Sequence, residues 1–218
     1  TCLHCNNLAA QSVKIGITHF PPLYVIEQGQ ASGGSLLAIM EQTLSRAKLH
    51  YQVAAYPPKR LYRGLADGTV DLFIGLKNNA LYHNNVIYSQ APVTYIVLRV
   101  YAINSKPLPQ NKQQLLGKNI GIIRGYGYGG IRSFLIAPEN KKFVSILNSH
   151  KNALAMLQAR RIDYLLDYQG PVNRELRDNP VPDLHFFTLS SLGAYFIVSK
   201  AGINAQQLLH ALETNLAR

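Results

Sequence analysis

The chain has 218 residues, 47% of them hydrophobic, and its 22 Lys and Arg against 11 Asp and Glu give a formal net charge of +11. This length and apolar share suffice for a sizeable core and exclude a disordered chain. Excess positive charge is typical of proteins that bind nucleic acid, anionic lipid or acidic ligands. The basic residues form no dense run, and zinc-finger spacings and aromatic RNP-type patterns are absent, so no nucleic-acid partner is predicted.

The N-terminal residues predict a processed or loose terminus. Leu8-Ala9-Ala10-Gln11 resembles the small-residue end of a secretory signal peptide, so residues 1–12 are expected to be a signal-peptide remnant or a disordered segment, and the protein to be periplasmic. Cys2 and Cys5 form one Cys-x-x-Cys pair here. A single pair gives little support for a zinc site or a thioredoxin-like redox motif, so no metal and no cofactor are predicted.

The first part of the chain is expected to alternate strands and helices. A strand is predicted from Val13 to Thr18, and Pro21-Pro22 predicts an extended loop after it. Further elements follow by the same criteria: a helix capped by Ser35 and running to about Lys48, a strand from Gln52 to Ala55, a helix from Pro58 to Asp67, and a strand from Val70 to Gly75. This pattern is typical of an α/β fold with mostly parallel strands.

A second α/β series follows a long β-rich run at Tyr95 to Ala102. Strands are predicted at Asn119 to Ile123, Phe143 to Ile146 and Ile162 to Leu166, and helices at Ile131 to Leu135, Ser149 to Ala159 and Val172 to Arg177. A strand at Tyr195 to Ser199 and a helix capped by Asn204 end the chain. If the strands at Tyr95 to Ala102 and Tyr195 to Ser199 carry the chain into and out of a second lobe, that lobe is an insertion. Lobe I is then 13–98 with 190–218, and lobe II is 99–189.

One segment occurs twice in loose form. Leu65-Ala66-Asp67-Gly68-Thr69-Val70-Asp71-Leu72-Phe73-Ile74 is echoed 92 residues later by Leu157-Gln158-Ala159-Arg160-Arg161-Ile162-Asp163-Tyr164-Leu165-Leu166. Each copy has the end of a leucine-bearing helix, a polar turn, a β-branched residue, an aspartate and an apolar strand. We interpret Asp71 and Asp163 as structural, and two related lobes predict a ligand-binding cleft between them.

Several motifs occur in a recognisable order: Val13-Lys14-Ile15-Gly16-Ile17, Phe20-Pro21-Pro22-Leu23-Tyr24, Tyr88-Ser89-Gln90-Ala91-Pro92, Gly117-Lys118-Asn119-Ile120-Gly121-Ile122 and Arg161-Ile162-Asp163-Tyr164-Leu165-Leu166-Asp167. This ordered set resembles the type II periplasmic solute-binding proteins of family 3, which serve ABC importers of polar amino acids. The resemblance implies two α/β lobes, a two-stranded hinge, closure around a small molecule, and a monomer that docks on the membrane subunits of an importer.

The ligand-contacting positions of lobe I depart from that family. Amino-acid-binding members carry an arginine about seven residues before the Tyr/Phe-Ser element, where it grips the ligand carboxylate with a bidentate fork. Here that position is Tyr82, and Lys77 and Asn79 stand where Thr or Ser is usual. The usual α-amino acid pose is therefore not supported by the sequence. Arg60, in the first turn of its helix, either points into the cleft or is a solvated cation.

Aromatic residues are expected to line the cleft. Phe20 and Tyr24 flank the double proline; the resemblance implies that one stacks on the ligand, with Phe20 ranked first and the other in the core. In lobe II, Gly125-Tyr126-Gly127-Tyr128-Gly129-Gly130 matches G-x-G-x-x-G, but no acid lies about 20 positions on and no Gly-Lys-Ser/Thr follows, which argues against a dinucleotide site or a P-loop. The backbone N–H groups of this loop are expected to hold an anionic or carbonyl oxygen, with Tyr126 and Tyr128 in the cleft.

Asp167 ends the strand of the second repeat copy, where the resemblance implies an aspartate that pairs with the ligand ammonium. No metalloprotease motif, nucleophile elbow or carboxylate cluster occurs, and His19 is interpreted as a loop histidine, so no catalytic residue is predicted. The sequence favours a binding protein for a small polar ligand, amino-acid-like or cationic. The alternatives are a ligand-sensing module and a dehydratase of the same fold, in which Asp167 and Lys77 would act on a cyclohexadienyl acid.

Overall fold

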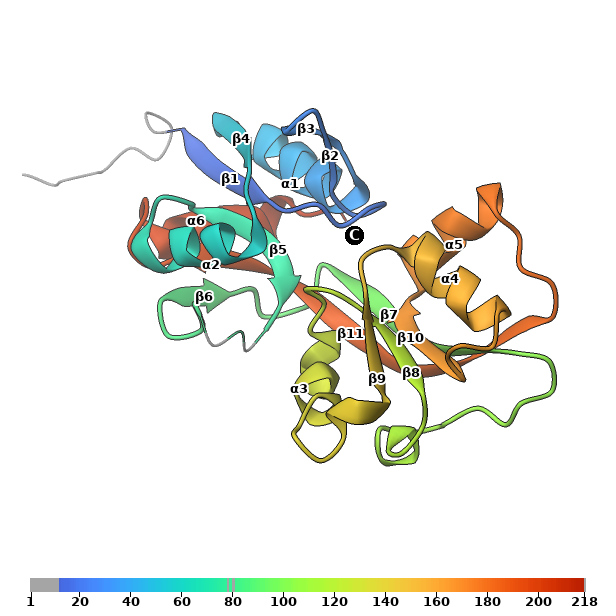
Figure 1. Ribbon diagram of the computed structural model, residues 1–218. Coiled ribbons are helices and arrows are strands. Elements are labelled where there is room, and N and C mark those ends of the chain that lie inside the picture. Colours follow the sequence, from blue (N-terminus) through green and yellow to red (C-terminus); the bar gives the residue numbers. More distant parts are fainter. Residues whose placement is uncertain (1–11, 78, 80, 218) are drawn as a thin grey trace, which may run out of the picture. The chain divides into compact units, whose positions relative to one another are not determined.

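The computed structural model describes residues 12–77, 79 and 81–217, and it divides into two compact units (Figure 1). Unit 1 comprises the chain up to Tyr95 and from Gly193 onward, and unit 2 comprises Ile96–Leu192. The sequence placed the two crossings at 98/99 and 189/190. Two long strands, β7 (Thr94–Ile103) and β11 (Leu184–Ser199), run through the crossings. Among the described residues, no helix has the length and apolarity needed to span a membrane.

Unit 1 is a mixed sheet with the strand order β4-β1-β5-β11, in which β1 pairs in parallel with β4 and β5. The last part of β11 is antiparallel to β5 and β6. Helix α1 packs against α6. The elements are β1 (Val13–Ile17), β2 (Val25–Glu27), β3 (Gln30–Gly33), α1 (Ser35–Arg46), β4 (Tyr51–Ala55), α2 (Pro58–Asp67), β5 (Leu72–Leu76), β6 (Val86–Tyr88) and α6 (Ala205–Asn215). Strands β2, β3 and β6, which are only three or four residues long, were not predicted from the sequence.

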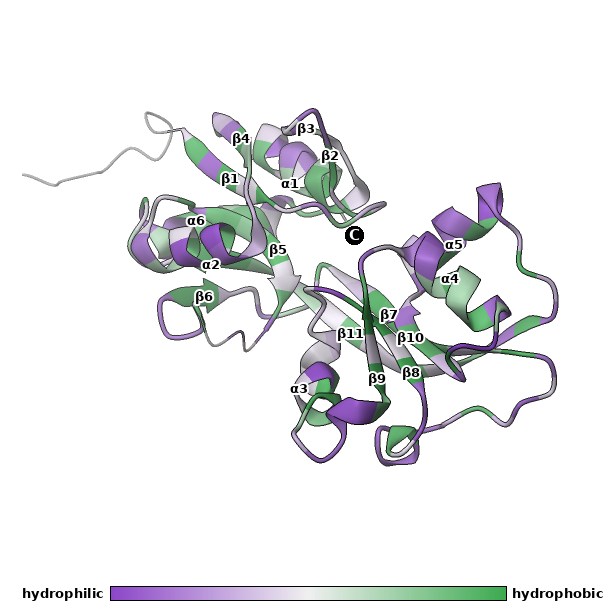
Figure 2. Cartoon of the chain, viewed as in Figure 1, coloured by the Kyte–Doolittle hydropathy of each residue, from purple (hydrophilic) through white to green (hydrophobic). Residues whose placement is uncertain are grey.

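Unit 2 is built on the order β11-β7-β10-β8-β9, in which β8 pairs in parallel with β9 and β10, and β10 is antiparallel to β7. Helix α4 packs against α5 and against the parallel strands. The elements are β8 (Ile120–Ile123), α3 (Ile131–Leu135), β9 (Val144–Leu147), α4 (His150–Gln158), β10 (Tyr164–Tyr168) and α5 (Gln169–Asp178). Figure 2 shows hydrophobic residues concentrated along the central strands, and every residue of β8 and β10 is buried.

Local sequence signals place several helix ends. Helix α2 begins at Pro58 and ends at Gly68, whose left-handed conformation (φ 85°) suits a glycine. The side chains of Ser149 and Asn204 accept N–H bonds at the starts of α4 and α6. The predicted cap by Ser35 is wrong. Gly34 takes the capping position with φ 121°, and a side chain there would collide with the Leu23 carbonyl, so only glycine fits.

The loop after β1 also differs from the prediction. Instead of an extended loop, the chain makes a compact turn around a cis Pro21–Pro22 bond. The N–H of Phe20 donates to the carbonyl of Tyr24, and the N–H of Tyr24 donates back to Phe20, both at 2.9 Å. The paired hydrogen bonds close the turn, so the double proline reverses the chain rather than extending it.

The two repeat aspartates come directly before β5 and β10 rather than inside them. Asp71 is buried and accepts N–H bonds from Lys14 (2.9 Å) and Ile203 (3.3 Å), which ties β5 to β1 and to the segment before α6. Asp163 accepts hydrogen bonds from Lys106 and from Asn119, the latter at 3.2 Å. Each carboxylate therefore joins its strand to neighbouring chain segments, a structural role.

Candidate functional site

Three predicted ligand residues of unit 1 follow the carboxyl ends of its parallel strands. Phe20 follows β1, Arg60 follows β4, and Lys77 follows β5 directly. Open α/β sheets bind ligands at this edge, because the loops leaving neighbouring strands meet there. Phe20 is half-buried, whereas Arg60 and Lys77 are exposed. These side chains remain accessible to a solute from the edge of the unit.

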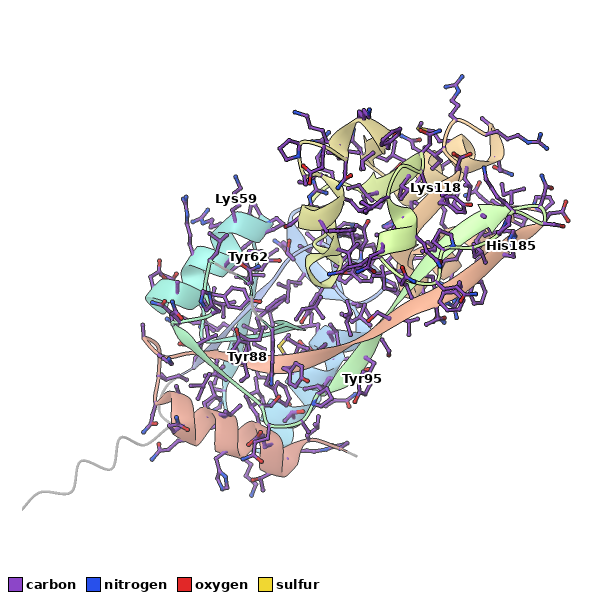
Figure 3. All side chains as sticks on the ribbon, turned by 90° about the horizontal axis from the view of Figure 1, so that it is seen from below. Lys59, Tyr62, Tyr88, Tyr95, Lys118 and His185 are labelled. Atoms are coloured by element: carbon purple, nitrogen blue, oxygen red, sulfur yellow. The ribbon has the colours of Figure 1, made fainter. Side chains whose placement is uncertain are left out.

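Lys77 is held by aromatic rings. Its Nζ lies 3.7 Å from the centroid of the Tyr195 ring and 5.5 Å from that of Tyr88, which is labelled in Figure 3. The ion pairs found within the described residues do not include Lys77. A cation over a ring face gains electrostatic attraction while it keeps most of its hydration. The ammonium is therefore positioned without being neutralised.

Arg60 and Asn79 are placed less distinctively. The Arg60 guanidinium lies 5.8 Å from the ring centroid of Tyr56 in the first turn of α2, a position compatible with both interpretations from the sequence. The Asn79 side chain accepts the N–H of Leu81 at 3.0 Å. His19 is a satisfied loop histidine, since its Nδ1 accepts the N–H of Ile26 at 3.2 Å.

Tyr24 and Tyr82 lie in the core of unit 1. For Tyr24 this is the core position expected of one of the two aromatics that flank the double proline, whereas Tyr82 was expected among the ligand contacts and does not reach solvent. Tyr24 is 1% exposed, stacks on Phe73 and donates its hydroxyl to the Ile74 carbonyl at 2.7 Å. Tyr82 is 2% exposed and donates to the Leu76 carbonyl at 2.9 Å. Burial raises the pKa of both phenols. A large ring with one polar atom suits a core position when a backbone carbonyl accepts its proton.

Asp167 is fully buried at the end of β10, with no exposed surface. Its Oδ2 lies 2.6 Å from Nδ1 of His150, and its Oδ1 accepts the N–H of Tyr168 at 2.8 Å. Burial raises the pKa of Asp167, and the His150 hydrogen bond opposes this rise. The sequence assigned this carboxylate to a ligand ammonium, but here the chain's own imidazole is its partner.

Sequence reasoning did not single out His150. The residue begins α4, three positions after the carboxyl end of β9. Asp167 lies at the carboxyl end of β10, and β8 separates the two strands. The signal available was that both residues belong to the same predicted edge of the same lobe. Because the sequence does not give the order of the strands, the 2.6 Å contact could not be read from it.

A cluster of tyrosines lies beside the Asp167–His150 pair, with the ring of Tyr126 5.7 Å from that of His150. The Tyr168 ring lies 5.5 Å from that of Tyr126 and 5.1 Å from that of Tyr128. The Tyr126 hydroxyl lies 3.3 Å from Nε2 of His150. Tyr128 is fully buried, and its hydroxyl accepts the N–H of Ile123 at 2.8 Å. The structure thus brings Tyr126, Tyr128 and Asp167 together, with Tyr128 as a core residue and Tyr126 half-buried.

The glycine-rich loop connects β8 to α3. Gly125, Gly129 and Gly130 have φ of 86°, 62° and 96°, in the left-handed region that favours glycine. The loop passes through a short turn into a helix of five residues. So short a helix carries only a small dipole, and the expected capture of a ligand oxygen by this loop stays a prediction.

Neither the protein-family models nor the curated proteins give a match. Solved structures do match. A histidine kinase sensor domain with similarity to periplasmic binding proteins has a TM-score of 0.73 and 17% identity over 94% of this chain and 89% of that one. The arginine-, lysine-, histidine-binding protein ArtJ of Geobacillus stearothermophilus has a TM-score of 0.67 and 18% identity over 94% and 89%. The GluR0 ligand-binding core in complex with L-glutamate has a TM-score of 0.73 and 16% identity over 95% and 93%.

The chain has the two-lobed fold of the periplasmic binding proteins. In this fold the described residues contain no group of three or more His, Cys, Asp or Glu arranged to hold a metal ion. Cys2 and Cys5 lie outside the described residues.

A pocket of about 280 Å³ opens in unit 2 where β10 begins and β7 ends, away from the end of β10 that carries Asp167. Its lining residues are Ile103, Asn104, Lys106, Leu157, Arg160, Ile162 and Asp163. None of the residues that the sequence predicted as ligand contacts belongs to it.

Proposed function

We propose that this protein is an extracytoplasmic solute-binding protein that holds a small polar molecule and performs no chemistry on it. The fold supports this proposal, and so do the polar and aromatic groups at the carboxyl ends of the parallel strands in each unit. The observation that carries it is the contact of 2.6 Å between Asp167 and His150, with the ring of Tyr126 5.7 Å from that of His150. Burying a carboxylate costs free energy, and a buried carboxylate with a specific partner at such an edge is typical of functional sites.

The positions of Asp167 and Lys77 favour binding over catalysis. A general acid must come within about 2.6–3.2 Å of the oxygen that it protonates. Asp167 has no exposed surface, and both its oxygens are engaged. Lys77 rests on the ring of Tyr195. Asp167, the carboxylic acid nominated for a dehydratase, is therefore out of reach of a substrate.

The solute is delivered to a membrane partner in our proposal. The first candidate is the membrane subunits of an ABC importer, served by a monomeric periplasmic protein whose lobes close on the solute. The similarity to a histidine kinase sensor domain favours a second candidate, a ligand-sensing module of a signalling system. Crosslinking in cells, followed by identification of the captured membrane protein, separates the two: permease subunits are expected for an importer and a kinase for a sensor.

The binding function is tested with protein purified without refolding. Native mass spectrometry should show a stoichiometric small molecule, and thermal unfolding should show stabilisation by one class among amino acids, amines and organic acids. A ligand at about 100 times its Kd stabilises the folded state by about 2.7 kcal/mol, which is easily measured. Protein that is empty, and that no compound of the panel stabilises, would contradict the proposal.

A further inference from the structure

The chain itself shields Asp167, the acid at the end of β10, from solvent. Asp167 has no exposed surface, whereas the side chain of His150 is 16% exposed. A carboxylate only accepts hydrogen bonds, so Nδ1 of His150 donates to Asp167 and the imidazole is the member of the pair that a solute can reach. An ammonium or guanidinium group of a solute would have to displace this ring before it met a carboxylate oxygen.

The accessible charges beside the pair are basic. Arg124 directly follows β8, is exposed, and donates its Nε to Asn148 at 2.8 Å. Lys151 follows His150 in the first turn of α4, where no acidic residue occurs. The other acids of unit 2 are Glu139, Asp163, Glu175, Asp178 and Asp183. None of them lies in the segments that join β8, β9 and β10 to the helices that follow.

These observations determine the sign of the charge offered at this edge. Its one carboxylate is covered, and the groups that face solvent are an imidazole, a guanidinium and an ammonium. A basic surface raises the local concentration of anions and disfavours cations. Charge-assisted hydrogen bonds from the guanidinium and the ammonium to a carboxylate are about twice as strong as neutral ones.

We propose that His150 determines the specificity of this site: by occupying Asp167 it removes the contact for a solute ammonium, so the solute is a small carboxylate anion rather than a cationic amino acid. The inference rests on the proposed binding function. It distinguishes this protein from ArtJ, of the same fold, which binds arginine, lysine and histidine.

The test uses probes that differ only in one ammonium group. Isothermal titration calorimetry compares glutarate with L-glutamate and succinate with L-aspartate, with L-arginine as the cationic probe. We expect the dicarboxylates to bind at least as tightly as their amino acid counterparts, and L-arginine not to bind. Tighter binding of L-arginine, or a preference of about tenfold or more for the ammonium-bearing member of each pair, would overturn the inference and leave the binding function intact. Failure of every probe, together with an empty protein in native mass spectrometry, would overturn both.

Variants of His150 give a second test. His150→Ala should uncover Asp167, so L-arginine should gain about tenfold or more in affinity, since one hydrogen bond to a charged group contributes about that factor. The double variant His150→Ala with Asp167→Asn is the matched control, and it should gain nothing. Lys118→Gln removes one positive charge from the exposed position just before β8 and should change no affinity.

Stability needs a separate readout, because His150→Ala leaves a buried charge without its partner. If this variant unfolds easily, L-arginine should raise its Tm and leave that of the double variant unchanged. His150→Gln, which keeps a donor for Asp167, should fold normally and still reject L-arginine. If His150→Ala gains neither affinity for L-arginine nor thermal stabilisation by it, His150 does not determine the specificity.

Discussion

The hydroxyl of Tyr24 donates a hydrogen bond to the carbonyl of Ile74 at 2.7 Å and accepts one from the N–H of the same residue at 3.2 Å. One buried side chain thus joins the turn after β1 to β5 across 50 residues of sequence. Tyr24→Phe leaves both backbone groups without this partner, so we expect the free energy of unfolding to fall by about 1–3 kcal/mol.

Chemical denaturation measures this loss, and Tyr95→Phe is the control. Tyr95 is 61% exposed and is labelled in Figure 3, so its hydroxyl should contribute less than about 0.5 kcal/mol. Equal effects of the two substitutions would mean that the Tyr24 hydroxyl does not stabilise the fold.

Gly68 is expected to tolerate no side chain. It ends α2 with φ 85°, and a Cβ there would lie 2.7 Å from the carbonyl carbon of Ala201. Gly29 has a similar φ of 79°, but a Cβ there would meet nothing within 4 Å. We expect Gly29→Ala to cost about 1–2 kcal/mol from backbone conformation alone, and Gly68→Ala to cost about 1–3 kcal/mol more from the collision. Urea unfolding of both variants isolates the second contribution, and identical losses would disprove the contact.

Asp163 should contribute a pH-dependent part of the stability. The hydrogen bond from Lys106 lowers the pKa of this carboxyl below its ordinary 3.8. An acid whose pKa is lowered by folding stabilises the folded state above its ordinary pKa and loses that contribution as the pH falls through the folded pKa. The Asp163 side chain is 33% exposed, so we expect less than about 1 kcal/mol.

Unfolding free energies measured at a series of pH values test this expectation. The difference between the wild type and Asp163→Asn should be largest at neutral pH and should shrink below about pH 4. Lys106→Met should show the same trend, because it removes the other member of the pair. A difference that grows with acidity would refute the assignment.

The contact between Lys77 and Tyr195 should be weak but measurable. At 3.7 Å from the ring centroid, an exposed ammonium is expected to contribute about 0.5–1 kcal/mol. A double-mutant cycle with Lys77→Met and Tyr195→Leu measures this coupling in chemical denaturation. Additive effects of the two substitutions would mean that the ring does not position the lysine.

The parts of the fold that depend on residues close together in the sequence were predictable. Pro58, Gly68, Ser149 and Asn204 all mark helix ends as the sequence indicated, because capping rules act within one turn. The start of α1 is the exception: Gly34 and not Ser35 takes the capping position, and the requirement for glycine there comes from Leu23 in a preceding segment.

The parts that depend on packing were not predictable. Tyr24 and Tyr82 suit a ligand platform and a core equally well, and only the backbone carbonyls that accept their protons decide between the two. His150 and Asp167 meet because α4 and β10 converge at one edge of unit 2. Strand order is set by contacts between distant segments, which periodicity does not encode.

The interruption of unit 1 by unit 2 affects the order in which the two units can fold. Unit 2 is one continuous stretch, Ile96–Leu192, and all of it is synthesised before the residues of β11 that pair with β5, Ala194 to Val198. Strands β1, β4 and β5 are made first, but β5 cannot pair with its antiparallel neighbour β11 until that strand has been made. The segment made in the middle can therefore complete its own core first, while this edge of β5 stays unpaired and open to misassembly until Ala194 to Val198 are available.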